Sequence, residues 1–216
     1  MRGFWQDIQR ILQQPEQGLL KIIVVNSSVF VLLMLFRLIS ILSGNAQVYE
    51  NLIESLTLSS SLTKTLQAPW TLISYFFVHV EIFHLAFNMM FLYWFGLILQ
   101  EFIGNQRSVR LYFIGGIVGA LAFLIAYNSI GYYQAKGISF LLGASGGVFA
   151  IVVAAATLRP NYEVHLFLIG PVRIKFIAGF YMQSVTVTIS VNCDGFNSVI
   201  TGRSRNANRN FATICY

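Results

Sequence analysis

The sequence predicts an all-α membrane protein, a polytopic bundle with five membrane-spanning helices. Hydrophobic residues make up 56% of the 216 residues, whereas charged residues make up only 10%. A soluble domain is closer to about one quarter charged, so these few charges cannot cover a water-exposed surface. The mean hydropathy is +0.67, and apolar runs of the length that a spanning helix needs, about 20 residues, recur along the chain.

The expected spans lie at residues 20–42, 80–100, 109–130, 141–158 and 172–191. The first contains Arg37, which is close enough to the end of the span to extend its charge to the interface. The fifth is the weakest, because its last third is rich in Thr and Ser.

Residues 43–79, between the first two spans, form an unusually long loop. Its beginning is too polar to span a membrane, and its second half, residues 68–79, is rich in aromatic side chains. Such a segment is typical of the membrane interface, with Trp70 at the level of the lipid headgroups. Long loops of this kind are often functional.

Basic residues gather at one set of helix ends. Eight lie there (Arg2, Arg10, Lys21, Arg107, Arg110, Arg159, Arg173 and Lys175), against two at the opposite ends (Lys64 and Lys136). The positive-inside rule therefore places the N-terminus in the cytoplasm. The net charge of +6 is explained by topology and needs no nucleic-acid partner. We expect an integral, multi-pass protein of a bacterial-type plasma membrane.

We divide the chain into three parts. Residues 1–19 are a cytoplasmic segment without the pattern of a cleavable signal peptide, residues 20–191 are the transmembrane domain, and residues 192–216 are a polar tail. The tail contains Arg203, Arg205 and Arg209 on the side where the rest of the chain avoids basic residues. Either a sixth helix is missing, or the tail departs from the ancestral design through a frameshift, a truncation or divergence.

The fourth span begins with the run Gly143-Ala144-Ser145-Gly146. Small residues leave space beside the Ser145 hydroxyl, and a helix N-terminus offers N–H groups and a positive dipole end to a developing oxyanion. The alternative is a Gly/Ala/Ser face that only packs against another helix.

The second span carries His84 and Asn88, whose i, i+4 spacing puts both side chains on one helix face. Both lie near the outer end of their span, at the depth expected for Ser145. Polar side chains inside a membrane are costly and are candidates for function. These two could stabilise an oxyanion, or they could form a polar contact between two helices.

Together these motifs resemble the rhomboid family of intramembrane serine proteases. The resemblance extends over residues 67–181 and includes Phe76-Phe77-Val78-His79 before His84 and the pair Gly115 and Gly119 on the third span, which we expect to pack inside the bundle. It implies a six-helix fold, Ser145 as nucleophile, His84 and Asn88 as oxyanion-stabilising residues, and Gly143 and Gly146 as residues that shape the site. It also implies transmembrane protein substrates cut near the outer face, and no cofactor or metal.

The general base remains unassigned. In rhomboids it is a histidine on the sixth helix, and the three histidines here are His79, His84 and His165. His79 is expected at the outer interface and His165 at the opposite side of the membrane, while Thr213 stands where the family's histidine would fall in a faint C-terminal match. We therefore expect a chain with little or no protease activity. The alternatives are a non-catalytic relative that binds transmembrane helices and an unrelated small transporter subunit.

Overall fold

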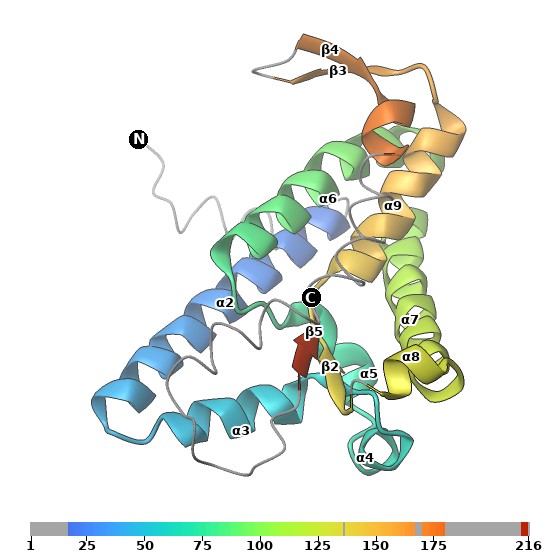
Figure 1. Ribbon diagram of the computed structural model, residues 1–216. Helices are drawn as coiled ribbons and strands as arrows, with labels where there is room; N and C mark the ends of the chain where they lie inside the picture. Colours follow the sequence, from blue (N-terminus) through green and yellow to red (C-terminus); the bar gives the residue numbers. More distant parts are fainter. Residues whose placement is uncertain (1–16, 136, 167–169, 180–212, 216) are drawn as a thin grey trace, which may run out of the picture.

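The computed structural model describes residues 17–135, 137–166, 170–179 and 213–215. Its core is a bundle of four helices, α2 (Gly18–Leu42), α6 (Ile82–Ile103), α7 (Asn105–Ser129) and α9 (Ser145–Leu158) (Figure 1). Among the described helices, α2, α6 and α7 are long and apolar enough to span a membrane, and α9 is a shorter apolar helix of 14 residues. The predicted helical membrane bundle is confirmed.

Glycines bring α9 into close contact with α7. A Cβ added at Gly115 would collide with Ala150, and one added at Gly119 would lie 3.6 Å from Gly146 Cα. Gly147 is equally tight, because its Cβ would lie 2.7 Å from the ring of Tyr112. The prediction that Gly115 and Gly119 pack inside the bundle is therefore confirmed, since small residues let the two backbones approach each other closely.

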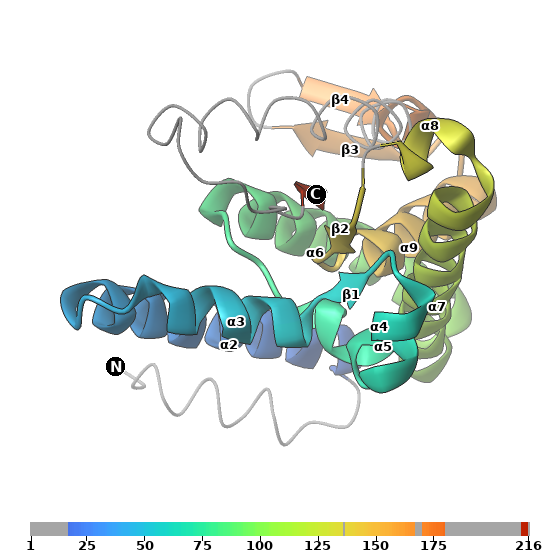
Figure 2. The ribbon, with the colours of Figure 1, turned by 60° about the horizontal axis from the view of Figure 1, so that its bottom comes forward.

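The long loop between α2 and α6 is folded. It contains α3 (Ala46–Leu56), the short strand β1 (Leu58–Ser59), α4 (Leu62–Gln67), α5 (Thr71–Ser74) and the 3₁₀ turn η1 (Tyr75–Phe77). The helix α3 packs alongside α2, as Figure 2 shows. It presents Tyr49 and Ile53 to the interior. These elements cover the end of the bundle at which α9 begins.

Short strands make up much of the rest of the described chain. After α8 (Gly131–Gln134), β2 (Ser139–Leu141) pairs antiparallel with β1 and parallel with β5 (Thr213–Cys215). At the opposite end of the bundle, β3 (Glu163–Leu166) and β4 (Gly170–Arg173) form an antiparallel hairpin (Figure 1).

Two predicted spans need correction. Residues 141–144 are not helical: Leu141 ends β2, and the positive φ of 102° at Gly143 is incompatible with a right-handed helix. The fifth span was predicted to begin at residue 172, but residues 170–173 are the strand β4, and helix begins only at residue 174. Residues 180–191 of that span, and most of the predicted polar tail, lie outside the described residues.

Candidate active site

Ser145 is the first residue of α9, with Ala144 as its N-cap. Its side chain is partly exposed, whereas Gly143 and Ala144 before it are buried. The first N–H groups of an α-helix have no acceptor within the helix, so this position offers backbone donors next to the hydroxyl. A helix of 14 residues is about 21 Å long, shorter than the roughly 30 Å hydrocarbon core. If the Arg159 end of α9 reaches one interface, Ser145 is recessed from the other.

The turn before Ser145 depends on Gly143. Its N–H donates a hydrogen bond to the carbonyl oxygen of Tyr75 at 2.9 Å, and its φ of 102° is one that glycine adopts without strain. A Cβ at this position would lie 2.7 Å from His84 Cε1. The glycine therefore allows both the turn and the close approach of the His84 ring, two residues before Ser145.

Tyr75 connects the loop between α2 and α6 to the rest of the fold through two hydrogen bonds. It is almost fully buried, its carbonyl holds Gly143, and its hydroxyl donates to the carbonyl oxygen of Gly116 on α7 at 2.7 Å. Burial raises its pKa above the ordinary value for tyrosine, so the hydroxyl stays protonated and continues to donate. Sequence reasoning missed this residue, because an aromatic side chain in an apolar segment gives no sign of its distant partners.

The pair His84 and Asn88 is on α6, which packs against α9. Asn88 is buried and donates from Nδ2 to the His84 carbonyl at 2.9 Å, one turn earlier in its own helix. Asn88 Oδ1 accepts no hydrogen bond from any described residue. The structure thus brings the His84 ring to the Gly143 turn and places Asn88 one turn deeper.

His79 is fully buried within the protein, which its predicted position at the outer membrane interface did not indicate. Its Nε2 accepts a hydrogen bond from the Ala144 N–H at 3.3 Å. Its ring centre is 5.2 Å from that of His84. Burial, with a smaller contribution from His84, lowers the pKa of His79 to about 3. A neutral imidazole therefore holds the backbone directly before Ser145.

The sequence that contains Ser145 and the two α6 residues can be compared with known families. The family model described as the Rhomboid domain matches residues 66–201, a stretch that includes all of the predicted site residues. The chain belongs to the rhomboid family.

Several curated rhomboid relatives are similar to this chain. RHOMBOID-like protein 12, mitochondrial, of Arabidopsis thaliana is 28% identical over 68% of this chain and 45% of its own length. Rhomboid protein 1, mitochondrial, of Saccharomyces cerevisiae is 32% identical over 47% of this chain and 30% of its own. Presenilin-associated rhomboid-like protein A, mitochondrial, of Danio rerio is 28% identical over 59% and 31%. The chain spans less than half the length of these relatives. No solved structure matches it.

The histidines of this rhomboid are divided between the two ends of the bundle. His79 and His84 lie beside the Ser145 turn, whereas His165 is on β3, after the far end of α9. The α9 helix separates this strand from Ser145 by about 21 Å along its axis, so His165 is at the wrong end to act on the Ser145 hydroxyl, as predicted. Of the two nearer histidines, His79 already uses its Nε2 as an acceptor for the Ala144 N–H.

Proposed function

We propose that this chain carries a rhomboid-type endopeptidase site that acts on transmembrane polypeptides, with Ser145 as nucleophile. The observation that carries the proposal is the position of Ser145 at the first residue of α9, with the His84 ring packed against the turn that precedes it. The predicted unrelated transporter subunit is wrong, because the chain belongs to the rhomboid family.

The reaction would be acyl transfer to the Ser145 hydroxyl. Ser145 Oγ attacks the scissile carbonyl, and the N–H of Ser145 and the side chains of His84 and Asn88 donate hydrogen bonds to the oxyanion. The scissile C–N bond then breaks and the amine leaves with the proton from the Ser145 hydroxyl. Water finally hydrolyses the acyl-enzyme, which releases the carboxylic acid product and restores the hydroxyl. Such donors are effective when they are positioned before the reaction begins. The contact between His84 and Gly143 and the position of Ser145 at the N-terminus of α9 support these roles. Gly143 and Gly146 would shape the site by keeping side chains out of it.

The proton of Ser145 needs an acceptor, and this determines the rate that we expect. A serine hydroxyl is a weak nucleophile without a base. His84 is assigned to the oxyanion, and the Nε2 lone pair of His79 is engaged by the Ala144 N–H. We therefore propose that this 216-residue chain cuts slowly, because the loss of a general base costs a factor on the order of 10² to 10⁴.

A second function is binding of transmembrane helices without cleavage. The same hydrogen bond from Ala144 to His79 favours it, since a histidine fixed to the backbone supports the turn and takes no proton from Ser145. In both cases the partners are membrane proteins and lipid.

The identity of the membrane and the orientation of the chain in it are also proposals. The basic residues at the α6–α7 junction and around the β3–β4 hairpin support a cytoplasmic N-terminus by the positive-inside rule. The relatives are named as mitochondrial or chloroplastic proteins. They give no support to the bacterial-type plasma membrane that we predicted, and an organelle membrane is equally compatible with the integral-membrane fold.

The proposal is tested by reconstituting the chain in liposomes with a model transmembrane substrate. We expect slow release of a product cut near the membrane face at which α9 begins, and no product from Ser145→Ala. Photo-crosslinking of the substrate to the unmodified chain and to Ser145→Ala measures binding separately from cleavage. Crosslinking without any cleavage would contradict the protease and favour the binding function, and cleavage that persists in Ser145→Ala would contradict the assignment of Ser145.

A further inference from the structure

A pocket of about 410 Å³ lies beside the active-site end of the bundle, between the folded loop and β2. It is formed by α3, β1, α4 and the segment after α4, and by β2. Its lining includes Asn51, Glu54, Ser59, Lys64, Gln67 and Phe140. The volume is within the range of small-molecule sites. The proposed function of Ser145 assigns no role to this pocket.

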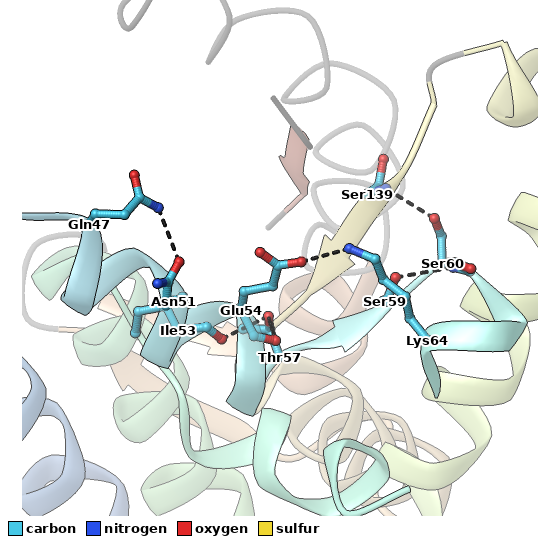
Figure 3. Close-up of polar contacts among 10 residues, drawn as sticks. Gln47, Asn51, Ile53, Glu54, Thr57, Ser59, Ser60, Lys64 and Ser139 are labelled. Atoms are coloured by element: carbon cyan, nitrogen blue, oxygen red, sulfur yellow. Dashed lines mark hydrogen bonds and ion pairs between the residues drawn. The ribbon is translucent and has the colours of Figure 1, made fainter. Parts of the chain in front are cut away.

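The pocket contains one positive and one negative charge. Lys64 Nζ lies 2.7 Å from Glu54 Oε1, and the two side chains are 45% and 50% exposed; Figure 3 shows them pointing toward each other. The Lys64 ammonium also lies 5.5 Å from the centre of the Phe140 ring. An exposed ion pair of this kind contributes only about 0–1 kcal/mol. A ligand that satisfies both charges can therefore separate them at little cost.

Neutral polar groups surround the ion pair. Asn51 accepts a hydrogen bond from Gln47 at 3.1 Å, and the Ser59 hydroxyl accepts one from the Ser61 N–H at 3.2 Å (Figure 3). The carbonyl oxygens of the Asn51 and Gln67 side chains are further acceptors for an ammonium group. The lining thus offers one ammonium donor together with several acceptors, and its formal charge is zero.

The helix α4, which contributes Lys64 and Gln67 to the pocket, also carries exposed apolar side chains, and Trp70 follows it in the chain. Leu62 and Leu66 on α4 are 50% and 80% exposed, and Trp70 is 55% exposed. The Trp70 indole N–H donates to the Ser55 carbonyl at 2.9 Å. In a membrane protein, exposed leucines beside a tryptophan indicate the boundary between headgroups and acyl chains. We therefore expect the loop that forms the pocket to lie at the level of the lipid headgroups.

We propose that this pocket binds the headgroup of a phosphoethanolamine lipid. The lipid phosphate would pair with Lys64, and its primary ammonium would donate to Glu54 and to the neighbouring amide oxygens, while the acyl chains lie against Leu62 and Leu66. The zero formal charge of the lining favours a zwitterion over an anionic lipid. A primary ammonium is favoured over a choline group, because a quaternary ammonium has no N–H with which to use these acceptors.

The test is native mass spectrometry of the full chain, released from nanodiscs that contain phosphatidylethanolamine and phosphatidylcholine in equal amounts. We expect the chain to retain phosphatidylethanolamine in preference to phosphatidylcholine by about tenfold, the factor that corresponds to one charge-assisted hydrogen bond. Glu54→Gln and Lys64→Gln should each abolish the preference. Glu163→Gln is the matched control, because Glu163 forms a similarly exposed ion pair with Arg173 at the other end of the bundle, and it should leave the preference unchanged.

Several outcomes would overturn the proposal. Equal retention of the two lipids by the unmodified chain would contradict the proposal. A preference for phosphatidylethanolamine that survives in both pocket variants would also contradict it. Added soluble phosphoethanolamine should reduce the retention of the lipid; if it does not, the headgroup is not what the pocket recognises. If the pocket variants lose crosslinking to the transmembrane substrate but keep the lipid preference, the pocket recognises polypeptide and the lipid assignment is wrong. None of these measurements depends on Ser145 being reactive.

Discussion

The two ends of the helical bundle are held together differently. At the Ser145 end, hydrogen bonds that involve buried residues join segments that are 41, 65 and 79 residues apart in the chain, through Tyr75, His79 and Ser60. At the opposite end, the β3–β4 hairpin carries an ion pair between Glu163 and Arg173 at 3.8 Å, with both side chains more than half exposed. A part-buried hydrogen bond from the Gly18 N–H to Asn105 joins α2 and α7 there.

This difference relates structure to the proposed chemistry. Buried hydrogen bonds contribute more than exposed ion pairs, and a buried polar group that loses its partner costs about 1–3 kcal/mol. The turn before Ser145 is therefore positioned by contacts that a substrate does not have to supply. Preorganised donors of this kind are what an oxyanion site requires. Four substitutions test the contrast, and they are taken in order of decreasing effect.

Gly143→Ala should have the largest effect. The new Cβ would lie 2.7 Å from His84 Cε1, and strain at a positive φ alone costs about 1–3 kcal/mol. We expect a loss of at least about 3 kcal/mol in the free energy of unfolding and displacement of the His84 ring. Gly104→Ala at the opposite end is the control, because Gly104 has a φ of 80° but open space around its Cβ position. Equal losses of stability in the two variants, measured by unfolding in detergent, would show that the His84 contact is unimportant.

His79→Leu should cost about 1–3 kcal/mol at pH 7, because the Ala144 N–H loses its acceptor in a buried site. The variant also tests a pH dependence. The pKa of His79 is about 3 in the folded chain against 6.5 ordinarily, so between these values the unfolded chain binds a proton that the folded chain does not. Stability should therefore fall as the pH is lowered from about 6.5 toward 3. Unfolding measured at several pH values should show a shallower fall in His79→Leu; parallel curves would contradict the burial of a neutral His79.

Tyr75→Phe should cost about 1 kcal/mol, because it removes the hydroxyl that donates to the Gly116 carbonyl while keeping the buried ring. Tyr162→Phe, at the opposite end, is the control, since its side chain is 42% exposed. Thermal unfolding of the two variants should separate them clearly. A Tyr75 variant as stable as the Tyr162 variant would mean that the loop is not fastened to α7 through this hydroxyl.

Glu163→Gln should have the smallest effect, less than about 0.5 kcal/mol, because its ion pair is exposed and long. The same unfolding assay measures it. A loss comparable to that of Tyr75→Phe would remove the contrast between the two ends.

The sequence predicts the helices of this fold better than it predicts the loop that builds the site. Continuous apolar runs gave α2, α6 and α7 to within a few residues, because the need for about 20 apolar residues is local. The small residues around Ser145 and the i, i+4 pair His84 and Asn88 could also be recognised in the sequence. The strand β2 could not be predicted, because it depends on pairing with β1, about 80 positions earlier in the chain.

The burial of His79 was missed for a similar reason. Its position before the second span suggests an interface, but its environment is set by Ala144, 65 residues away. Tyr75 likewise gains its role from Gly116 and Gly143. Local patterns carry no information about such partners until the helices are packed.

The central claim is that the N-terminus of α9 presents Ser145 as a nucleophile, and covalent labelling tests it most directly. The chain in liposomes is treated with a fluorophosphonate probe, and the modified residue is located by peptide mapping. We predict slow labelling of Ser145 that is lost in Ser145→Ala and kept in Ser43→Ala, a change at an exposed serine of the same end. Labelling that continues unchanged in Ser145→Ala, or no labelling of Ser145 in the unmodified chain, would contradict the claim.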